Sequence, residues 1–361
     1  MLKCGMKLYL HAKREIGRGN KLVRIGSDKL IAAAIAVAVL LVAGAAAFAF
    51  WPDSDAGSRA DVQPRGALAE YSWEELSAIS REISSCGDQD EAVRCAARYG
   101  LCQEDGAIDP EQVKAVSLAN GTTVRVVLAG VWHDARTDGG KAGLTFAFAD
   151  AAGQHAMNHA FEDAEGDMAD SAGGWAASDM RAWLNGDFLR ELPAELRGCI
   201  VSAQKRVASY VDAQDESVEA GHLAGTATDW VGETSDKLWL FSAAELCGSV
   251  PENEAMGIEE TMAAVYAGEG EQYPLFAQSG VAAFAPNELL VRTQPGEQAA
   301  CTWWLRTKML EFGDGFWFVG TDGTPLNGLG EDARIVEDPE YAPDELWGPD
   351  HARGVVVGFC L

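Results

Sequence analysis

Residues 30–50 form an uninterrupted apolar run, LIAAAIAVAVLLVAGAAAFAF, that contains no charged side chain. At ~1.5 Å per residue, a helix of this length spans roughly 30 Å, which matches the hydrocarbon thickness of a bilayer. Such a helix satisfies its own backbone hydrogen bonds, so lipid exposure leaves no backbone group unpaired. Trp51 and Pro52 follow directly and supply an interfacial indole and a helix stop. The run therefore predicts a single transmembrane helix over residues 30–51, in contact with the lipid bilayer.

Charge is distributed unevenly on the two sides of this run. Residues 1–29 hold eight of the 28 lysines and arginines but only two of the 55 acidic residues. Because basic flanks stay inside, the sequence predicts a cytoplasmic segment over residues 1–29 and an extracellular C-terminal part at the cell membrane. A cleaved signal peptide is the alternative, since Ala47-Phe48-Ala49 fits a cleavage pattern. The apolar run and the basic leader are both longer than such a peptide usually has.

The part of the chain beyond the apolar run is strongly acidic, with 20 basic and 53 acidic residues. Phosphates need a basic face, so this composition argues against nucleic acid and anionic lipid as partners of the outer part. The acidity is typical of a soluble surface, and attraction for divalent cations or cationic partners is the alternative interpretation.

A linker and a pair of helices precede the main domain. The polar segment 52–70 lacks an apolar period and predicts a linker. Residues 71–112 predict a helical hairpin, in which Ser72 and Glu75 make a capping box at the first helix. Asp88 is the expected N-cap of the second helix.

Beyond residue 112 the apolar pattern changes to the period of two that is typical of strands. Residues 113–118 and 122–131 flank Asn120-Gly121, the strongest short signal for a β-hairpin. Helical and extended segments then alternate without a βαβ rhythm, so the expected fold class is α+β. Residues 251–300 are acidic and weakly periodic, and predict an insertion with some helix within a domain over residues 113–361.

Five segments in this domain carry a resemblance to a known family. They are GGWAASDMRAWLNGDF (173–188), TSDKLWLFSAAELCG (234–248), WWLRT (303–307), FVGTDGTPLNG (318–328) and GVVVGF (354–359). Together they resemble a domain family of unknown function from surface proteins of gut-dwelling Gram-positive bacteria. The family usually ends on a Gly-Val-Arg-Pro type of strand, whereas this chain has Val356 and Val357 in place of Arg-Pro.

The same C-terminal arrangement, a WW-x-R strand followed by hairpins and a glycine-containing last strand, is similar to C-type-lectin-like and sulfatase-modifying-factor folds. This resemblance implies a mixed domain with a mostly antiparallel sheet and long irregular loops. Such a scaffold carries binding or display functions more often than catalysis, although fold alone does not establish function.

The lectin-like resemblance directs attention to the last hairpins of the chain. Hard cations need several converging oxygens, and Asp314, Asp322, Asn327 and Asp332 flank these hairpins. Trp317 lies among them in less regular surroundings and is the expected sugar-stacking residue. Calcium is the one cofactor that this arrangement leaves open, and solvated turns are the alternative interpretation.

Other tryptophans divide into two groups. Trp230 and Trp347 also lie in less regular surroundings and are further candidates for stacking. The others that we single out fall within helix or strand patterns and are predicted to belong to the core: Trp183, Trp239, Trp303 and Trp304.

Motifs for catalysis or metal binding are weak. His155 and His159, with Glu162 and Asp163 nearby, would share one face of a helix as zinc ligands do, but a glutamate after the first histidine is missing. His133-Asp134 is weaker still. The sequence holds no G-x-S-x-G elbow, P-loop or H-E-x-x-H motif, so it predicts neither a catalytic residue nor a metal ligand.

Seven cysteines lie beyond the apolar run, and an odd number leaves at least one thiol unpaired within the chain. Cys86, Cys95 and Cys102 bracket the helical hairpin, where a bridge that includes Cys86 or Cys102 is expected. The lectin-like resemblance implies that Cys301 and Cys360 lie close together as a second disulfide. Its sulfatase-modifying counterpart would instead make these two thiols reactive.

The sequence thus predicts a membrane-anchored extracellular module that binds or displays a ligand, with cell-envelope glycan or another surface protein as partner. An envelope-assembly protein that self-associates through the helical hairpin or a free cysteine is one alternative. An extracytoplasmic enzyme of unidentified reaction is the other.

Overall fold

The computed structural model describes residues 62–159, 161–162, 167–168, 171, 173–208, 230–253, 258, 260–310, 315–327 and 348–361. These residues all belong to one compact unit, 60–361. The predicted cytoplasmic segment, the transmembrane helix and most of the linker lie outside the described residues. Among the residues that are described, no helix is both long and apolar enough to cross a bilayer.

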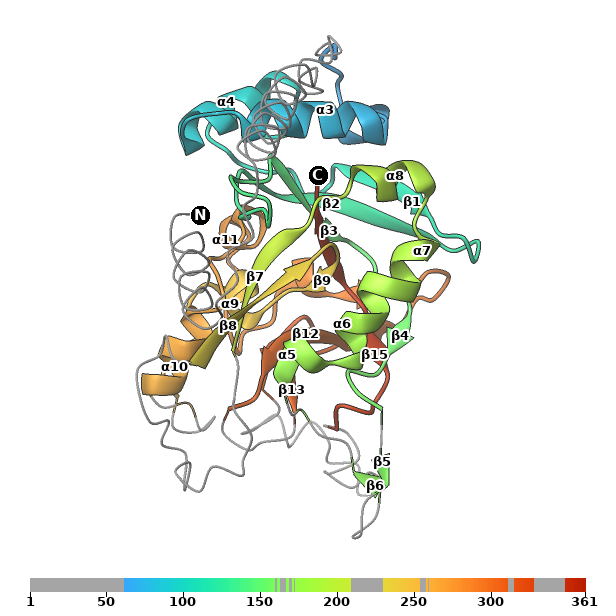
Figure 1. Ribbon diagram of the computed structural model, residues 1–361, viewed down its shortest axis with the longest axis vertical. Helices are drawn as coiled ribbons and strands as arrows, with labels where there is room; N and C mark the ends of the chain where they lie inside the picture. The colour runs from blue at the N-terminus through green and yellow to red at the C-terminus, as the bar shows by residue number, and fades with distance from the viewer. Residues whose placement is uncertain are drawn as a thin grey trace, which may run out of the picture. The chain divides into compact units, whose positions relative to one another are not determined.

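The predicted helical hairpin is present as α3 (Trp73–Ser84) and α4 (Gln89–Arg98), after a 3-10 turn at Leu68–Glu70. The two helices lie side by side at one end of the unit (Figure 1). Ser72 and Glu75 form the capping box in both directions, and the Asp88 side chain accepts a hydrogen bond from the Glu91 amide. These local signals are therefore confirmed.

The first sheet has five strands, in the order β1 (Val113–Ser117), β2 (Thr123–Val131), β3 (Leu144–Phe148), β16 (Val357–Cys360) and β9 (Trp239–Leu240). All neighbouring strands in it are antiparallel. The predicted Asn120-Gly121 hairpin joins β1 to β2, and Gly121 has the positive φ of 86° that this turn requires. β16 lies between β3 and the edge strand β9, so residues 357–360 join β9 to the rest of the sheet.

The second sheet also has five strands, in the order β14 (Pro325–Leu326), β13 (Phe316–Val319), β12 (Trp303–Lys308), β15 (Arg353–Gly354) and β4 (Gln154–His155). Only the β12–β15 pair is parallel among the described strand pairs. Three two-stranded ladders complete the strands: β5 (Phe161–Glu162) with β6 (Asp167–Met168), β7 (Ala203–Ala208) with β8 (Val231–Asp236), and β10 (Arg292–Thr293) with β11 (Ala300–Cys301). The expected α+β class with a mostly antiparallel sheet is confirmed.

Short helices connect and cover these sheets. They are α5 (Gly174–Ala177), α6 (Asp179–Trp183), a π-helical turn (Leu184–Phe188), α7 (Leu189–Glu191), α8 (Ala194–Cys199), α9 (Ala243–Cys247), α10 (Glu260–Ala267), α11 (Pro274–Gln278) and a 3-10 turn (Glu288–Leu290). The segment 251–300 does contain helix, as predicted. Its Tyr266, Tyr273 and Phe276 are buried, so it contributes to the core.

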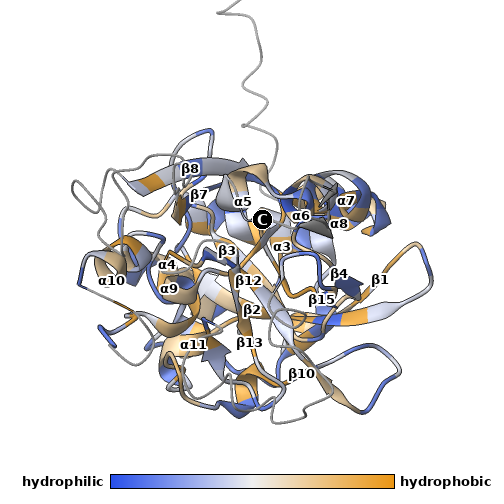
Figure 2. Cartoon of the chain, turned by 90° about the horizontal axis from the view of Figure 1, so that it is seen from below, coloured by the Kyte–Doolittle hydropathy of each residue, from blue (hydrophilic) through white to orange (hydrophobic). Residues whose placement is uncertain are grey.

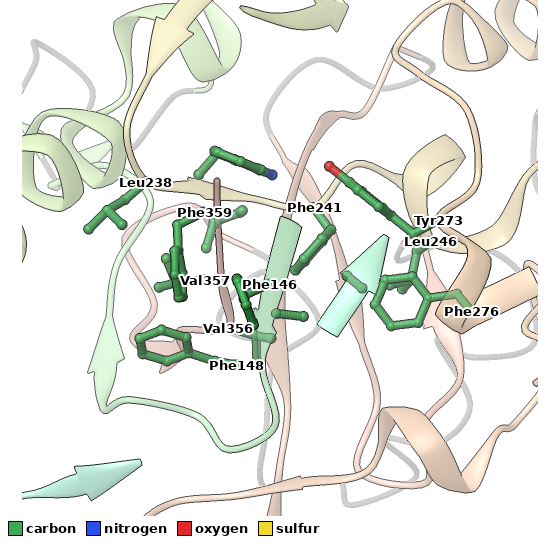
Figure 3. Packing of buried hydrophobic residues seen from close by; sticks show 14 of the residues in the cluster. Phe146, Phe148, Leu238, Phe241, Leu246, Tyr273, Phe276, Val356, Val357 and Phe359 are labelled. Carbon is green, nitrogen blue, oxygen red and sulfur yellow. The ribbon is translucent and has the colours of Figure 1, made fainter. Parts of the chain in front are cut away.

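Aromatic rings pack together along β3 and β16 of the first sheet, whose residues are all buried. Phe146 stacks on Phe359 with ring centroids 5.3 Å apart, and Phe148 meets Phe359 edge-on at 6.3 Å. Figure 3 shows these three side chains among their neighbours in the core. Trp73 of α3 packs edge-on against Phe146 at 5.9 Å. Hydrophobic residues follow the central strands, while peripheral turns are hydrophilic (Figure 2). The helical hairpin is therefore packed on the same core as the sheet.

Close backbone contact fixes α3 against the sheet. The Ser80 hydroxyl of α3 donates to the Leu361 carbonyl and accepts from the Leu144 amide at 3.1 Å. Gly143 lies directly under α3, and a Cβ there would overlap the Ser80 carbonyl oxygen. Glycine is required at this position because two backbones approach each other closely.

Candidate functional site

The segments that carry the family resemblance join parts of the core. Asp236 of the second segment is 1% exposed and accepts hydrogen bonds from Trp175 Nε1 at 3.0 Å and Arg181 Nε at 2.6 Å. Asn185 of the first segment accepts from the Lys237 amide at 2.8 Å and donates to the Leu238 carbonyl at 2.9 Å. These side chains hold α5, α6 and the π-helical turn against the β8–β9 connection. Their polar atoms are hydrogen-bonded within the protein and serve this structural contact.

A second set of contacts between elements is a buried ionic network centred on Lys205, which is 2% exposed. Its ammonium donates to Asp134 Oδ1 at 2.7 Å and to the Tyr273 hydroxyl at 3.0 Å, forms an ion pair with Glu245, and lies 4.4 Å from the Trp239 ring centre. Burial alone would raise the pKa of Asp134, but the Lys205 ammonium holds it well below its usual value. The carboxylate is therefore charged at neutral pH.

Arg306, from the WWLRT segment, extends this network. Its guanidinium pairs with Glu245 and donates to the carbonyls of Leu240 at 2.9 Å and Arg206 at 3.0 Å. Burial opposes the charge of Glu245, yet Arg306 and Lys205 keep its pKa below the usual value. Because all these groups are buried, the network is a structural element and offers no surface to a ligand.

An accessible cluster lies instead where β4 meets α6. The rings of His155 and Trp183 stack with centroids 4.3 Å apart and planes 20° apart, and both side chains are half-buried. We call this pair the His155–Trp183 stack. Phe188 packs against Trp183 at 4.9 Å, and the Trp304 indole donates to the His155 carbonyl at 3.2 Å. The stack is thus held by the core on one side and reaches the surface on the other.

Local sequence explains how this position arises. Ser178 caps α6 by accepting a hydrogen bond from the Arg181 amide at 3.1 Å. The chain then widens into the π-helical turn 184–188, which continues α6 directly after Trp183. Such turns are rare and occur frequently at functional sites. Sequence reasoning assigned Trp183 to the core because its spacing fits a helix face, and that spacing does not reveal the partial exposure.

Polar groups border the His155–Trp183 stack. His159, whose side chain is 80% exposed, forms an ion pair with Asp179, and its amide donates to the same carboxylate at 2.9 Å. The hydrogen bond to Asp179 raises the pKa of the His159 imidazole. Asn158 accepts from the Asp179 amide at 3.1 Å. Together these residues form a small polar rim beside two partly exposed rings.

The structure does not place the two histidines as a helical zinc pair. His155 belongs to β4, so the two imidazoles do not share a helix face. No group of three or more potential metal ligands occurs among the described residues. Asp163 lies outside them, and the zinc alternative has no further support. His133 stacks on Tyr273 at 4.1 Å beside Asp134 of the buried network.

The expected ligand residues of the last hairpins are not assembled as predicted. Trp317 is 0% exposed and packs between Tyr266 and Phe284, at 5.5 and 5.4 Å, which contradicts its role as a sugar-stacking residue. Asp322 is exposed and accepts from the amide of a neighbouring turn residue at 3.0 Å, whereas Asn327 is fully buried.

Several remaining candidates fall elsewhere. Asp314, Asp332 and Trp347 lie outside the described residues, and Trp230 is half-buried directly before β8. Trp239, Trp303 and Trp304 are fully buried, which confirms their assignment to the core.

The seven described cysteines all carry free thiols in this structure. Cys360 lies in β16 within 3.3 Å of the Thr145 hydroxyl, and Cys301 lies in β11. In the helical hairpin, Cys102 donates to the Val93 carbonyl at 3.7 Å, and Cys86 donates to the Glu82 carbonyl at 3.8 Å. Neither the Cys301–Cys360 bridge nor the expected bridge at Cys86 or Cys102 in the helical hairpin is formed here.

Comparison with known proteins gives one match. Residues 154–332 match a family described as Domain of unknown function (DUF6273). No curated protein and no solved structure matches the chain. The matched segment contains the His155–Trp183 stack, the residues around Asp236 and Arg306 of the buried network. The predicted likeness to a domain of unknown function is thereby supported for this part of the chain.

Proposed function

We propose that this protein is a membrane-anchored extracellular binding module, and that its outer domain holds a cell-envelope glycan at the His155–Trp183 stack. The observation that carries this proposal is a tryptophan that is only half-buried in a domain whose other motif tryptophans are fully buried. Amphipathic rings that reach the surface pack well against the C–H faces of sugars. The polar rim of His159 and Asp179 supplies hydrogen-bonding groups beside them.

Charge narrows the class of glycan. The part of the chain beyond the apolar run holds 53 acidic and 20 basic residues, so it repels polyanions. A neutral polysaccharide is the ligand class that fits both the ring stack and this charge.

The anchor and the lectin-like likeness support the same proposal from the sequence. An uncharged run over residues 30–50 behind a basic segment favours a domain held outside the membrane. Residues 68–70 of the predicted linker already form a 3-10 turn with Leu68 buried, so the polar residues 52–61 are the part that would give the domain reach toward the envelope. Binding of another surface protein at the same place is an outcome that the following experiment separates.

The test is retention of the full chain, in nanodiscs of neutral lipid, on isolated cell wall and on a panel of neutral polysaccharides, with calcium and with chelator. Loss of the ring contact in Trp183→Ala should weaken binding by about tenfold, since aromatic contacts contribute about 0.5–1.5 kcal/mol beyond area burial. Trp132→Ala is the matched control, because Trp132 is also half-buried and has the Lys141 ammonium 5.1 Å from its ring centre.

Retention of the natural chain that Trp183→Ala alone reduces supports the proposal. An equal loss of retention in Trp183→Ala and Trp132→Ala would contradict the placement of the glycan site at the His155–Trp183 stack. Absence of retention on every glycan would overturn the proposed function and leave a protein partner as the alternative. Stronger retention with calcium than with chelator would indicate that a cation takes part in binding at the site.

A further inference from the structure

We propose that the Lys205 amine and the Asp134 carboxyl group condense to an amide bond between their side chains, with Glu245 as the proton carrier. This inference is independent of the proposed function. The ion pair described above is the starting state of the reaction, and it holds the same elements together until the bond forms.

The two reacting groups are already in contact. Asp134 follows β2 and Lys205 lies on β7, and the Lys205 Nζ atom lies 2.7 Å from Asp134 Oδ1. The nitrogen therefore lies next to the carboxyl carbon that it would attack. Lys205 is 2% exposed and Asp134 is 5% exposed, so core packing holds this geometry. Fixed proximity of two reactants raises their effective concentration to about 10⁵ M or more.

Glu245, in the first turn of α9, is placed to move protons between these groups. Its Oε1 atom pairs with Lys205, whereas its Oε2 atom pairs with Arg306 and accepts from the Ser242 amide at 3.1 Å. One carboxylate oxygen is thus held by the protein, and the other faces the lysine nitrogen. A base beside an amine is the arrangement that makes the amine a nucleophile.

Two hydroxyls hold the other oxygen of Asp134. Thr145 donates to Oδ2 at 2.6 Å, and Tyr273 donates to the same atom at 3.0 Å. Negative charge develops on this oxygen when an amine adds to the carboxyl carbon, and donors that are already in place stabilise that charge. The neighbouring rings of Trp239 and Tyr273 are fully buried, which keeps away the water that would hydrolyse the amide.

The reaction balances within the site. A proton passes from the Lys205 ammonium to Asp134 Oδ1, which gives an amine and a carboxylic acid. The nitrogen then bonds to the carboxyl carbon, and an electron pair of the C=O bond moves to Oδ2. Glu245 takes a proton from that nitrogen and delivers it to Oδ1. The bond from carbon to Oδ1 breaks, water leaves, and the C=O bond at Oδ2 forms again.

Charge favours the product. Before the reaction, Lys205 and Arg306 pair with the two carboxylates of Asp134 and Glu245. The amide removes one charge of each sign and leaves Arg306 paired with Glu245. Buried charges have a large desolvation cost, so replacing one buried ion pair with a neutral amide favours condensation.

The experiment is tryptic peptide mapping by mass spectrometry of the full chain, purified in detergent and denatured before digestion. Trypsin releases Asp134 on peptide 126–136, and it does not cleave after an acylated Lys205, which stays on peptide 198–206. The expected product is 126–136 linked to 198–206, with a mass below the sum of the two peptides by one water molecule. An unreacted chain gives 126–136 and 198–205 as separate peptides.

Three variants separate the roles of the residues. Lys205→Met removes the nucleophile and should abolish the linked product, whereas Lys237→Met, on the β8–β9 turn, should keep it. Glu245→Gln preserves the size of the side chain but does not carry the proton, so its peptides should stay unlinked. On a denaturing gel, the natural chain should migrate faster than Lys205→Met, because its residues 134–205 form a closed loop.

Separate peptides 126–136 and 198–205 from the natural chain would overturn the inference, and this readout depends on no variant. A lost water that maps to a cyclic imide within a single peptide would overturn it as well. A linked product that also forms in Glu245→Gln would refute the role of Glu245 as the proton carrier.

Discussion

Replacing Lys205 with methionine should destabilise the domain strongly, because it removes the ammonium that Asp134 and Glu245 share. Both carboxylates are buried, and the ammonium lies 2.7 Å from Asp134. Removing one partner of a buried ion pair costs about 3–5 kcal/mol. Methionine preserves most of the apolar stem, so the loss reflects charge rather than a cavity. Tyr273 and Arg306 still contact the two carboxylates, so we expect the lower end, about 3 kcal/mol.

The assay is urea unfolding of the full chain at pH 7, followed by tryptophan fluorescence. The pKa of Lys205 is raised and that of Asp134 is lowered, so both groups are charged in the folded state at this pH. With a slope of about 3 kcal/mol/M, a loss of about 3 kcal/mol moves the midpoint down by about 1 M. Lys237→Met is the matched control on the β8–β9 turn and should stay within about 0.5 kcal/mol of the natural chain.

A loss below about 1 kcal/mol in Lys205→Met would refute this reasoning, because the carboxylates would then be hydrated or already neutral. Adding Asp134→Asn to Lys205→Met should recover part of the stability, since the amide no longer needs a cation. A double variant that loses the sum of both single effects would show that packing, and not charge, explains the cost.

Three further predictions test other features. Gly143→Ala should lower the free energy of unfolding by about 1–3 kcal/mol, because the added Cβ would overlap a backbone carbonyl of α3. Gly186→Ala is the control and should be close to neutral, since nothing lies within contact distance of a Cβ there. Equal effects of the two substitutions would contradict the close approach of α3 to Gly143. Burial opposes ionisation of Asp150, but hydrogen bonds from a neighbouring guanidinium hold its pKa below the usual value. The stability that the Asp150 carboxylate contributes is thus fully present above its unfolded pKa of about 3.9 and is lost as the pH falls through the folded pKa. The melting temperature of Asp150→Asn should therefore approach that of the natural chain below pH 4. A difference in melting temperature that stays constant with pH would refute the pairing. Asp179→Asn should lower the raised pKa of His159 in an NMR titration of the imidazole, and an unchanged titration would disprove the ion pair.

Local signals in the sequence predicted local structure well. The Ser72 capping box and the Asn120-Gly121 hairpin each depend on a few adjacent residues, and both appear where expected. Trp303 and Trp304 are core residues, as their strand pattern indicated. In these cases the physical cause acts within a turn or two of the chain, so the pattern contains enough information.

Features that depend on distant residues were not predictable in the same way. Trp317 was expected at the surface, but every residue of β13 is buried, since both faces of this strand are covered. Asp134 belongs to a network whose partners, Lys205 and Tyr273, come from separate elements far along the chain. The sequence gives the residue types of such a network but not the sheet order that brings them together. The His155–Trp183 stack was missed for the same reason.

The position of β16 has a consequence for biosynthesis. Residues 357–360 pair with β3 on one side and β9 on the other, and the Leu361 carbonyl accepts the Ser80 hydroxyl of α3. Both neighbouring strands are synthesised long before this segment leaves the ribosome. The edges of β3 and β9 that pair with β16 therefore stay unpaired until then. Unpaired strand edges readily join other chains. The first sheet is therefore completed only once residues 357–360 have left the ribosome, and a nascent chain that stalls before residue 357 exposes two unpaired strand edges.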